Sequence, residues 1–421
     1  MPSLLTTSDA MRSALSNRPA VEAALGDPGQ WQLTEVSDGN MNSVFRVAGP
    51  SGSVIAKHAP PYIRVIGEGW PFPQSRLDFE HAALIEHGRI CPNFVPAVLD
   101  YDDQLPLLVL EDLREHRVAR QALIDATPLP LLGQHMGQFL ALSLFHTSDL
   151  ALDTTDKKAL VSRFAGNAEL CATTEEVIFN GPYWSAPLNR WNDQLKSLVE
   201  TWHGDRDLHF EASKLNYAFR TKTQALIHGD LHTGSVMVTA DDTRVIDHEW
   251  AFHGPMGFDI GAIIGNLLIA HFAQAGHGAT NRKGQAVNRN AYTQDILTMI
   301  SDLWLTFTAE FRRLAHAARD MSDRALLTPR LFDEQLTDRF LDEYLAAVLL
   351  DTAGFAGAKM TRRVIGISHV EDLELIEDPA TRAIHERQVL KAARGLILNR
   401  GWLRSIDDLI DLATGSATTS T

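Results

Sequence analysis

The chain has 421 residues, of which 45% are apolar and 22% charged, and its formal net charge is −15. A chain of this length exceeds what one hydrophobic core usually supports, so two lobes are expected. An acidic surface repels a phosphate backbone, which argues against nucleic-acid binding. If the ligand is an anionic nucleotide, a few cations must therefore gather in one cleft against the overall field.

Cysteine usage and the N-terminal sequence bear on the compartment. Cys91 and Cys171 stand far apart and form no CxxC pair, so neither a disulfide framework nor a cysteine-based zinc site is expected. The N-terminus lacks the basic start, apolar run and small-residue cleavage site of a secretion signal. No window holds about 18 uninterrupted apolar residues, so no transmembrane span is expected. These features predict a cytoplasmic protein with reduced cysteines.

The N-terminal part of the sequence predicts a small α+β lobe over residues 1–110. Its first 30 residues indicate helix interrupted by proline. Short stretches rich in β-branched and aromatic residues then predict antiparallel strands, separated by the turn sequences DGN and GPSG. The predicted segments are 31–36, 42–47 and 53–58 for three strands, 76–87 for a helix, and 95–101 and 105–110 for two more strands.

Residues 111–116 are interpreted as a hinge, and residues 117–412 as a larger, mostly helical lobe with the catalytic loop and metal site. Residues 225–247 interrupt the helical pattern and predict two short strands that bracket a loop. The polar residues 413–421 are predicted to be a disordered tail. Later helices are predicted at 258–275, 291–317, 331–353 and 379–397, where apolar residues recur with helical spacing.

The strongest chemical signal is LIHGDLHTGSVMV at residues 226–238, followed by TRVIDHE at residues 243–249. Asp230 and Asp247 each lie just after an apolar strand, where loops on a rigid scaffold commonly carry chemistry. Phosphoryl transfer to a hydroxyl needs one carboxylate to accept the hydroxyl proton and another to hold Mg²⁺ on the phosphates. Asp230 suits the first task and Asp247 the second.

Glu249 is predicted to be the second Mg²⁺ ligand. It stands two residues after Asp247, and on an extended segment two such residues point to the same face. Two carboxylates, with phosphate oxygens and waters, supply the hard oxygen ligands that Mg²⁺ prefers. His228 is expected to brace its loop by hydrogen bonds to backbone carbonyls, with metal ligation as the alternative. Asp259 is expected either to cap the following helix or to brace the catalytic loop.

These motifs resemble the HGDxxxxN…D signature of aminoglycoside phosphotransferases and choline kinases. They are more closely similar to the methylthioribose kinase family, whose motifs include HGDLHTGS and a later GPMGFD. The second segment here reads DHEWAFHGPMGFD over residues 247–259. The similarity covers about residues 31 to 400, because it extends to DGNMNSVFR at 38–46, VIAK at 54–57, LVLEDL at 108–113 and KMTRR at 359–363.

The resemblance implies a two-lobed, protein-kinase-like α+β fold, with an antiparallel sheet in the small lobe and a helical large lobe. It implies Mg²⁺- and ATP-dependent phosphorylation of 5-methylthioribose to its 1-phosphate in methionine salvage, by a homodimer. On the nucleotide side, Asn40 would lie in the turn over the phosphates, and Lys57 would pair with the α- and β-phosphates. Glu111 and Leu113 would receive adenine through hinge backbone groups. Glu80 is a candidate ion-pair partner of Lys57.

Two arginines and one serine complete the predicted site. Arg362 and Arg363 resemble the family's twin-arginine element, which implies that they hold the ribose hydroxyls and the transferred phosphoryl group. Ser235 stands where the wider group has an asparagine metal ligand. Because serine binds Mg²⁺ poorly, Glu249 is expected to replace it, with Ser235 supporting the loop. His248 replaces the proline that is usual in the family.

Three alternatives remain open from the residues. The first keeps the fold and changes the acceptor to an aminoglycoside, a choline-like alcohol or another sugar. The second is a metallohydrolase that would bind Zn²⁺, Mn²⁺ or Fe tightly and need no ATP. The third is a non-catalytic nucleotide-binding regulator, against which the presence of both aspartates argues. The hydrolase would require a cluster drawn from His228, Asp230, His232, Asp247, His248 and His253.

Overall fold

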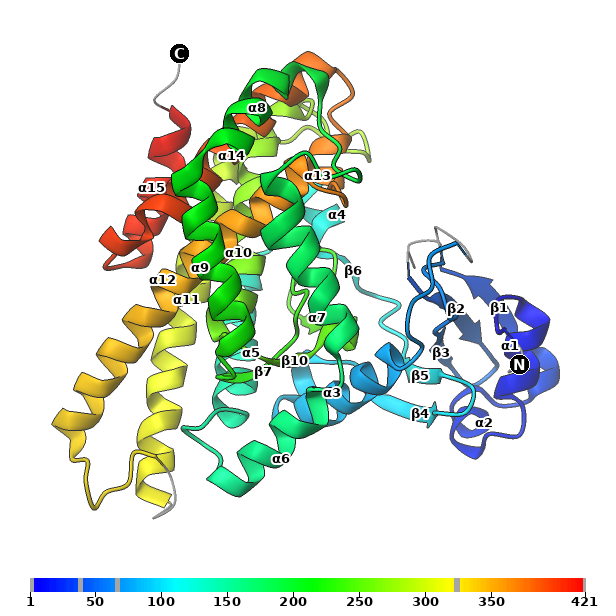
Figure 1. Ribbon diagram of the computed structural model, residues 1–421. Coiled ribbons are helices and arrows are strands. Elements are labelled where there is room, and N and C mark those ends of the chain that lie inside the picture. Colours follow the sequence, from blue (N-terminus) through cyan, green and yellow to red (C-terminus); the bar gives the residue numbers. More distant parts are fainter. Residues whose placement is uncertain (1–3, 37–40, 65–68, 322–325, 419–421) are drawn as a thin grey trace. The chain divides into compact units, whose positions relative to one another are not determined.

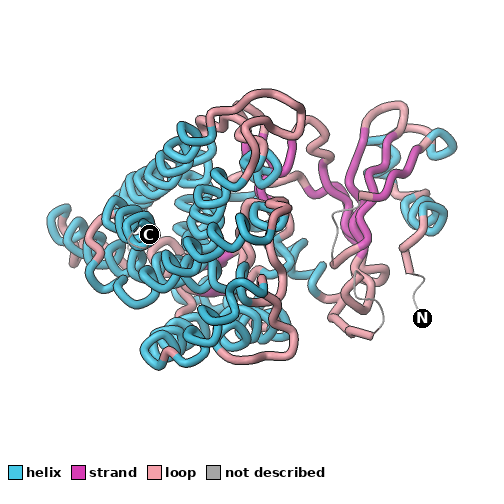
Figure 2. The backbone as a smooth tube through the Cα atoms, turned by 90° about the horizontal axis from the view of Figure 1, so that it is seen from above, coloured by secondary structure: helices cyan, strands magenta, loops and turns pink. Residues whose placement is uncertain are grey.

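The computed structural model describes residues 4–36, 41–64, 69–321 and 326–418 (Figure 1). The chain divides into two compact units. The first unit comprises Met1–His116 and Arg244–Ala251, and the second comprises Arg117–Thr243 and Phe252–Thr421. Helices make up most of the second unit, and the larger sheet belongs to the first (Figure 2). The predicted small lobe ends close to this boundary, but Arg244–Ala251 was expected in the helical lobe and packs instead with the first unit.

The first unit is built on a five-stranded antiparallel sheet with the order β1-β2-β3-β5-β4. The predicted order of three strands, a helix and two strands is confirmed. Strand β3 pairs with β2 on one side and with β5 on the other, so that Lys57 of β3 lies opposite Val44 and Leu108. The strands are β1 (Gln32–Glu35), β2 (Ser43–Ala48), β3 (Ser53–His58), β4 (Val98–Asp102) and β5 (Leu107–Glu111).

One face of this sheet is covered by the N-terminal helices α1 (Ser8–Leu15) and α2 (Pro19–Leu25). The Thr7 side chain accepts a hydrogen bond from the backbone N–H of Ala10 and so caps α1. Alternate residues of β2 are buried, as expected for a strand with one face on a core. The shared core contains Met11, Leu15, Val21, Leu25, Phe45 and Val47.

Helix α3 (Arg76–Ile90) carries the unit's second packing surface. A short 3-10 helix, η6 (His248–Trp250), packs against it. The rings of His87 and His248 lie 5.2 Å apart, and those of Phe72 and Trp250 lie 6.2 Å apart. These contacts explain why the DHEW segment folds with the first unit.

The core of the second unit consists of long helices that pack in pairs. Helix α10 packs against α12, and α11 packs against α5. The long helices are α5 (Leu132–His146), α10 (Met256–Ala273), α11 (Arg289–Met321), α12 (Glu334–Ile365) and α14 (Pro379–Asn399). Shorter helices surround them: α4 (Ala119–Ile124), α6 (Thr154–Phe164), α7 (Ala168–Glu175), α8 (Lys196–Gly204), α9 (Arg206–Thr221), α13 (Glu371–Glu374) and α15 (Ile406–Thr418).

Glycines bring α10 close to the backbone of α12. Gly257, Gly261 and Gly265 recur every fourth residue and therefore share one face of α10. A Cβ on Gly261 would lie 2.5 Å from the carbonyl oxygen of Thr352 and 2.8 Å from the backbone nitrogen of Ala356. Backbone atoms cannot yield as a flexible side chain can, so α10 and α12 cross at a spacing that only glycine permits.

The substitution Gly261→Ala is expected to destabilise the protein by about 1–3 kcal/mol, because overpacking outweighs the gain in helix propensity. Urea unfolding followed by circular dichroism measures this change. Gly204→Ala is the control, since a Cβ at that helix end meets no atom within 4 Å. Equal unfolding midpoints for the two variants would contradict the packing argument.

The HGDLHTGS segment lies between two short strands, as predicted. Strand β7 (Ala225–Ile227) pairs antiparallel with β10 (Phe252–Gly254). Strand β8 (Val236–Val238) pairs antiparallel with β6 (Arg117–Val118), and β9 (Thr243–Val245) follows it.

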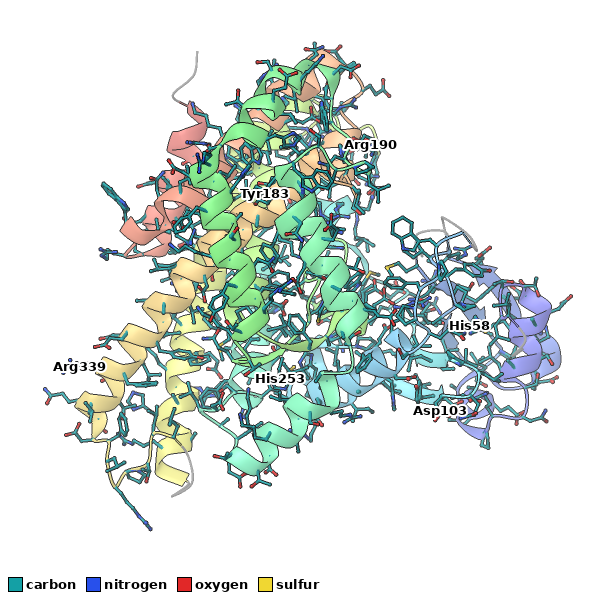
Figure 3. The ribbon with its side chains drawn as sticks, in the orientation of Figure 1. His58, Asp103, Tyr183, Arg190, His253 and Arg339 are labelled. Atoms are coloured by element: carbon teal, nitrogen blue, oxygen red, sulfur yellow. The ribbon has the colours of Figure 1, made fainter. Side chains whose placement is uncertain are left out.

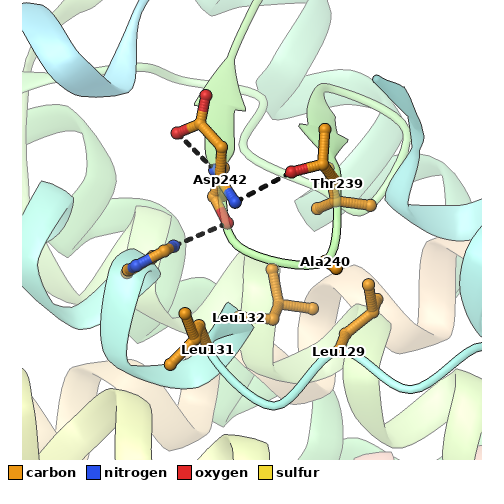
Figure 4. Close-up of a pocket in the computed structure, with 9 residues that line it drawn as sticks. Leu129, Leu131, Leu132, Thr239, Ala240 and Asp242 are labelled. Carbon is orange, nitrogen blue, oxygen red and sulfur yellow. Dashed lines mark hydrogen bonds between the residues drawn. The ribbon is translucent and has the colours of Figure 1, made fainter. Parts of the chain in front are cut away.

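A hollow between the turn after β8 and the start of α5 is too small to admit a water molecule, so it is no ligand site (Figure 4).

Two expectations about sequence segments need correction or qualification. The predicted disordered tail at 413–421 is wrong up to Thr418, because the buried residues Leu409 and Ala413 extend the apolar face of α15. Met256–Gly276 is long and apolar enough to cross a membrane by length and composition alone. Its most apolar window is 94% buried, as in the core helix of a soluble protein. Cys91 and Cys171 are free thiols.

Candidate active site

The HGDLHTGS loop begins after the buried strand β7 and is held by the first turn of α10. Asp259 accepts hydrogen bonds from the backbone N–H groups of His228, at 2.6 Å, and Gly229, at 3.0 Å. Gly229 has a φ of 84°, a left-handed conformation that favours glycine. Of the two expectations for Asp259, the loop brace is therefore confirmed, whereas the N-cap of α10 is Pro255. His228 also braces the loop, since its Nδ1 accepts from the backbone N–H of Asp230 at 3.3 Å.

Ser235 and His232 fix the interior of the loop. The Ser235 hydroxyl lies 3.0 Å from the carbonyl oxygen of Asp230 and accepts from the backbone N–H of His232 at 3.1 Å. The ring Nδ1 of His232 accepts from the backbone N–H groups of Gly234, at 2.9 Å, and Ser235, at 3.1 Å. A nitrogen that accepts from two amides carries no proton, so the proton of the neutral ring is on Nε2. That Nε2 lies 3.5 Å from Oδ2 of Asp230.

Cations from α12 approach the Asp230 carboxylate. Lys359 Nζ lies 2.9 Å from Oδ1, and Arg362 Nη1 lies 3.6 Å from the same oxygen. Burial opposes ionisation of Asp230, but Lys359, His232 and Arg362 together outweigh it, and the pKa of the carboxyl is held well below its usual range. Asp230 is therefore a carboxylate at neutral pH.

Arg363, the second predicted arginine, points to a different neighbour. Its Nη1 donates to the carbonyl oxygen of Ser368 at 2.9 Å, and burial, followed by the charge of Arg362, lowers its pKa to about 9. The charge of Arg120 also contributes to the lowered pKa of Arg363. The Nε of Arg120 lies 3.2 Å from a carboxylate oxygen of Asp372. The cations that the acidic composition led us to expect are thus concentrated in this part of the second unit, on α12 and α4.

In the first unit, Lys57 is the centre of a second charged cluster. Its Nζ lies 2.9 Å from Glu80 and 2.8 Å from Asp247, and its side chain is 5% exposed. The suggested pairing with Glu80 is confirmed. Burial opposes the charge of Lys57, but Asp247, Glu80 and Glu249 outweigh it and raise the pKa of the ammonium. Lys57 is therefore a permanently charged group on β3.

The two predicted metal ligands do not lie on an extended segment. Asp247 has a φ of 65°, in the left-handed region, and His248–Trp250 form a 3-10 helix, so the argument from alternating faces was wrong. Left-handed conformations at residues other than glycine cluster at functional sites. Glu249 is buried, and its Oε2 accepts from Asn42 Nδ2 at 2.6 Å and lies 3.8 Å from Arg76 Nε.

The donor set of these two residues fits Mg²⁺. Both offer carboxylate oxygens, and the Asp247 side chain is 50% exposed, which leaves it reachable by a phosphate-bound ion. No group of three or more His, Cys, Asp or Glu side chains able to hold a metal ion occurs in the described part of the chain. Within each unit, the described residues therefore form no three-residue cluster of the kind that the metallohydrolase alternative requires.

The remaining nucleotide-side predictions lie at three places. Asn40 lies outside the described residues. Glu111 is the last residue of β5, and its side chain accepts from the backbone N–H of Ala97 at 3.1 Å. Leu113 is buried in the following segment, where its carbonyl oxygen accepts from the backbone N–H of His116 at 3.0 Å.

Sequence reasoning missed several residues that contact the predicted ones. Lys359 was noted only as part of the KMTRR motif. Arg76, whose side chain is fully buried, donates to Asn42 at 2.9 Å and to the carbonyl oxygen of Pro60 at 2.9 Å. A charged residue within an apolar pattern, as at Arg76 beside Leu77, was the available signal.

Comparison with known proteins shows the family of the chain. The model of the "Phosphotransferase enzyme family" matches residues 32–286. A methylthioribose kinase 1 from Oryza sativa subsp. japonica is 41% identical over 395 residues, which cover 93% of this chain and 91% of that protein. The chain belongs to the methylthioribose kinase family. A methylthioribose kinase from Escherichia coli O45:K1 is 39% identical over 411 residues, covering 97% and 96% of the two chains.

Membership of this family identifies the chain as a small-molecule kinase. The antiparallel sheet of the first unit and the mostly helical second unit confirm the predicted fold class. A methylthioribose kinase from Geobacillus sp. (strain WCH70) is 37% identical over 381 residues, covering 90% of this chain and 88% of that protein. Among solved structures, a choline kinase from Cryptosporidium parvum Iowa II covers 94% of this chain and 99% of its own, with a TM-score of 0.43 and 12% identity.

Buried histidines predict that the protein loses stability in acid. Burial lowers the pKa of His232 to about 3 and that of His277 to about 4. Unfolded histidines titrate near pH 6.5, so between about pH 6.5 and 4 the unfolded chain binds protons that the folded chain does not. Stability therefore falls as the pH falls through this window, by about 3 kcal/mol for His232 alone. Burial also lowers the pKa of His58 (labelled in Figure 3), His203, His271 and His385.

Urea unfolding at a series of pH values measures this dependence, with an expected decrease of the midpoint from pH 7 to pH 4.5. The variant His232→Asn is the comparison, because it removes one of the groups that resist protonation. A midpoint that is constant over the series would contradict the sign of these pKa shifts.

Proposed function

We propose that this chain transfers the γ-phosphoryl group of ATP to the 1-hydroxyl of 5-methylthioribose. The observation that carries the proposal is the buried carboxylate of Asp230 in the HGDLHTGS loop, which contacts Lys359. The chain that carries this loop is 37–41% identical to methylthioribose kinases. A buried carboxylate that stays ionised is a group poised to take a proton from an acceptor hydroxyl.

In the proposed step, the acceptor oxygen forms a bond to the γ-phosphorus while the bond from that phosphorus to the β–γ bridging oxygen breaks. The hydroxyl proton passes to Asp230, and ADP carries away the electron pair of the broken bond. Asp230 later releases the proton to solvent. The low pKa of Asp230 means that it takes the proton only as the new bond forms, since a ground-state hydroxyl would not protonate it.

Asp247 and Glu249 would hold Mg²⁺, with Lys57 beside Asp247 at 2.8 Å. When bound, Mg²⁺ neutralises charge on the β- and γ-phosphate oxygens. Lys57 would pair with the α- and β-phosphates, and its partner Glu80 fixes its position on β3. Glu249, held by Asn42, replaces the asparagine ligand of the wider group at the position of Ser235.

Other groups would orient the two substrates. Arg362 and Arg363 would hold the ribose hydroxyls and the transferred phosphoryl group. The backbone of Glu111 and Leu113 would receive adenine. We further propose that the protein is cytoplasmic and forms a homodimer. Sedimentation at several protein concentrations tests the oligomeric state.

The test is an acceptor panel scored by ADP release. Purified protein is mixed with Mg-ATP and methylthioribose, ribose, kanamycin, choline or glucosamine, and the phosphorus spectrum of each product identifies the phosphorylated position. ADP release with methylthioribose and an anomeric phosphate signal are expected, and both should stop when EDTA removes Mg²⁺. Turnover of another acceptor in preference to methylthioribose would favour the first alternative.

A further inference from the structure

Lys359 is a buried cation that the proposed reaction has not yet used. It lies on α12, its side chain is 2% exposed, and its Nζ is 2.9 Å from Oδ1 of Asp230. The same Nζ lies 4.6 Å from the centroid of the Phe258 ring, a distance at which a cation is attracted to the aromatic face. Burying an ammonium is costly unless it is paired, so its retention beside a catalytic carboxylate calls for a chemical reason.

The surroundings of the Asp230 carboxylate are asymmetric. Oδ1 faces two cations of α12, Lys359 at 2.9 Å and Arg362 at 3.6 Å. Oδ2 faces the Nε2–H of the neutral His232 ring, at 3.5 Å. Oδ1 is therefore the oxygen held by charge, whereas Oδ2 keeps lone pairs for another donor.

We propose that Lys359 is a positioning residue for phosphoryl transfer, which fixes Asp230 through Oδ1 and presents Oδ2 to the acceptor hydroxyl. This inference rests on the proposed kinase function. The hydroxyl proton goes to Oδ2, and Lys359 keeps its own three protons throughout. Once Asp230 is protonated, the positive charge of Lys359 is no longer compensated by the carboxylate, and it attracts the oxygens of the phosphoryl group in transit.

The charge state of Lys359 agrees with this role. Burial lowers its pKa to about 8, while Asp230 opposes that shift and the charges of Arg362 and Arg363 add to it. Lys359 is therefore still protonated at neutral pH. A neutral side chain at this position could donate a hydrogen bond to Oδ1, but it would favour the ionised carboxylate less than the ammonium does.

The first arm of the test compares Lys359→Met with Lys359→Arg by kcat, KM and the pH profile of kcat/KM. Lys359→Met is expected to lower kcat by about 100-fold with little change in KM for ATP. The acidic limb of the kcat/KM profile of Lys359→Met should move to higher pH, because Asp230 loses the nearest cation. The groups facing Asp230 that remain are Arg362, always charged, and His232, neutral over this range. Lys359→Arg should return the limb toward the wild-type position, and an unmoved limb in Lys359→Met would overturn the proposal.

Lys157 supplies a matched control within the same unit. It is equally buried, and burial lowers its pKa to about 8 as well. Its Nζ donates to the carbonyl oxygens of Thr147, at 3.0 Å, and Gln224, at 2.8 Å, and lies 3.2 Å from Nδ1 of His253, which Figure 3 labels. Lys157→Met should lower the unfolding midpoint without moving the acidic limb. The same limb shift in both variants would show that loss of any buried lysine suffices, and would overturn the assignment.

The second arm needs no substrate. Urea unfolding of the wild type, Lys359→Met, Asp230→Asn and the double variant gives the coupling between the two side chains as a double-mutant cycle. If the two side chains are coupled but methylthioribose does not stimulate ADP release, the assignment of the acceptor is wrong and the Lys359–Asp230 interaction is still supported. The pH profile is then measured with the acceptor that the panel identifies. Normal ADP release without coupling and without a limb shift would overturn the role of Lys359 and leave the kinase proposal standing.

Discussion

Replacing Asp230 with asparagine is expected to reduce kcat by about 10²–10⁴-fold, while KM for ATP stays near its wild-type value. The amide keeps the shape of the side chain and can still contact Lys359, which lies 2.9 Å from Oδ1 in the wild type. It has no basic oxygen to take the acceptor's proton. The loss should therefore fall on the chemical step, and single-turnover measurement of ADP formation separates that step from product release.

Folding must be separated from chemistry in this experiment. Asp230→Asn removes the carboxylate that balances the charge of buried Lys359, whose pKa is already lowered to about 8. Lys359 can then lose its proton at small cost, so the variant is expected to fold. Asp342→Asn, at an exposed carboxylate on α12 that pairs with Arg312, is the neutral control. Wild-type kcat in Asp230→Asn would rule out the proposed proton acceptor.

The sequence was most informative where local pattern decides structure. The strands around Lys57 and the strand before HGD were predicted because β-branched residues and turn residues are local signals. The conformation of Asp247 was not predicted, because no local sequence pattern indicates a left-handed aspartate followed by a 3-10 helix. The argument that put Asp247 and Glu249 on one face therefore failed, although the residue types still suit Mg²⁺.

Long-range contacts account for the other omissions. Lys359 and Asp230 are 129 positions apart, and Asn42 and Glu249 are 207 positions apart, so no periodicity relates them. The prediction also ended helix α12 too early, at residue 353, where glycines begin to weaken the helical signal. A Cβ on Gly357 would lie 2.6 Å from the carbonyl oxygen of Ala393, so this glycine serves helix packing. The continued helix is what brings Lys359 to Asp230.

Replacing Lys57 with methionine is expected to abolish most activity and to destabilise the first unit. The change removes the cation that Glu80 and Asp247 contact, at 2.9 Å and 2.8 Å. Glu80 is fully buried, and leaving one partner of a buried pair without its counterion costs about 3–5 kcal/mol. KM for ATP should rise, and kcat should fall, because the proposed contact to the α- and β-phosphates is also lost.

A second substitution separates these two effects. In the double variant Lys57→Met, Glu80→Gln the buried carboxylate is neutralised, so the unfolding midpoint in urea should recover toward the wild-type value. Activity should not recover, because the glutamine restores no charge for the phosphates. Recovery of both stability and ATP turnover would mean that Lys57 acts only by balancing Glu80, and that the nucleotide is held by other cations. Recovery of stability alone supports the assignment of Lys57 to the nucleotide, since the fold is then intact and only the contact to ATP is missing.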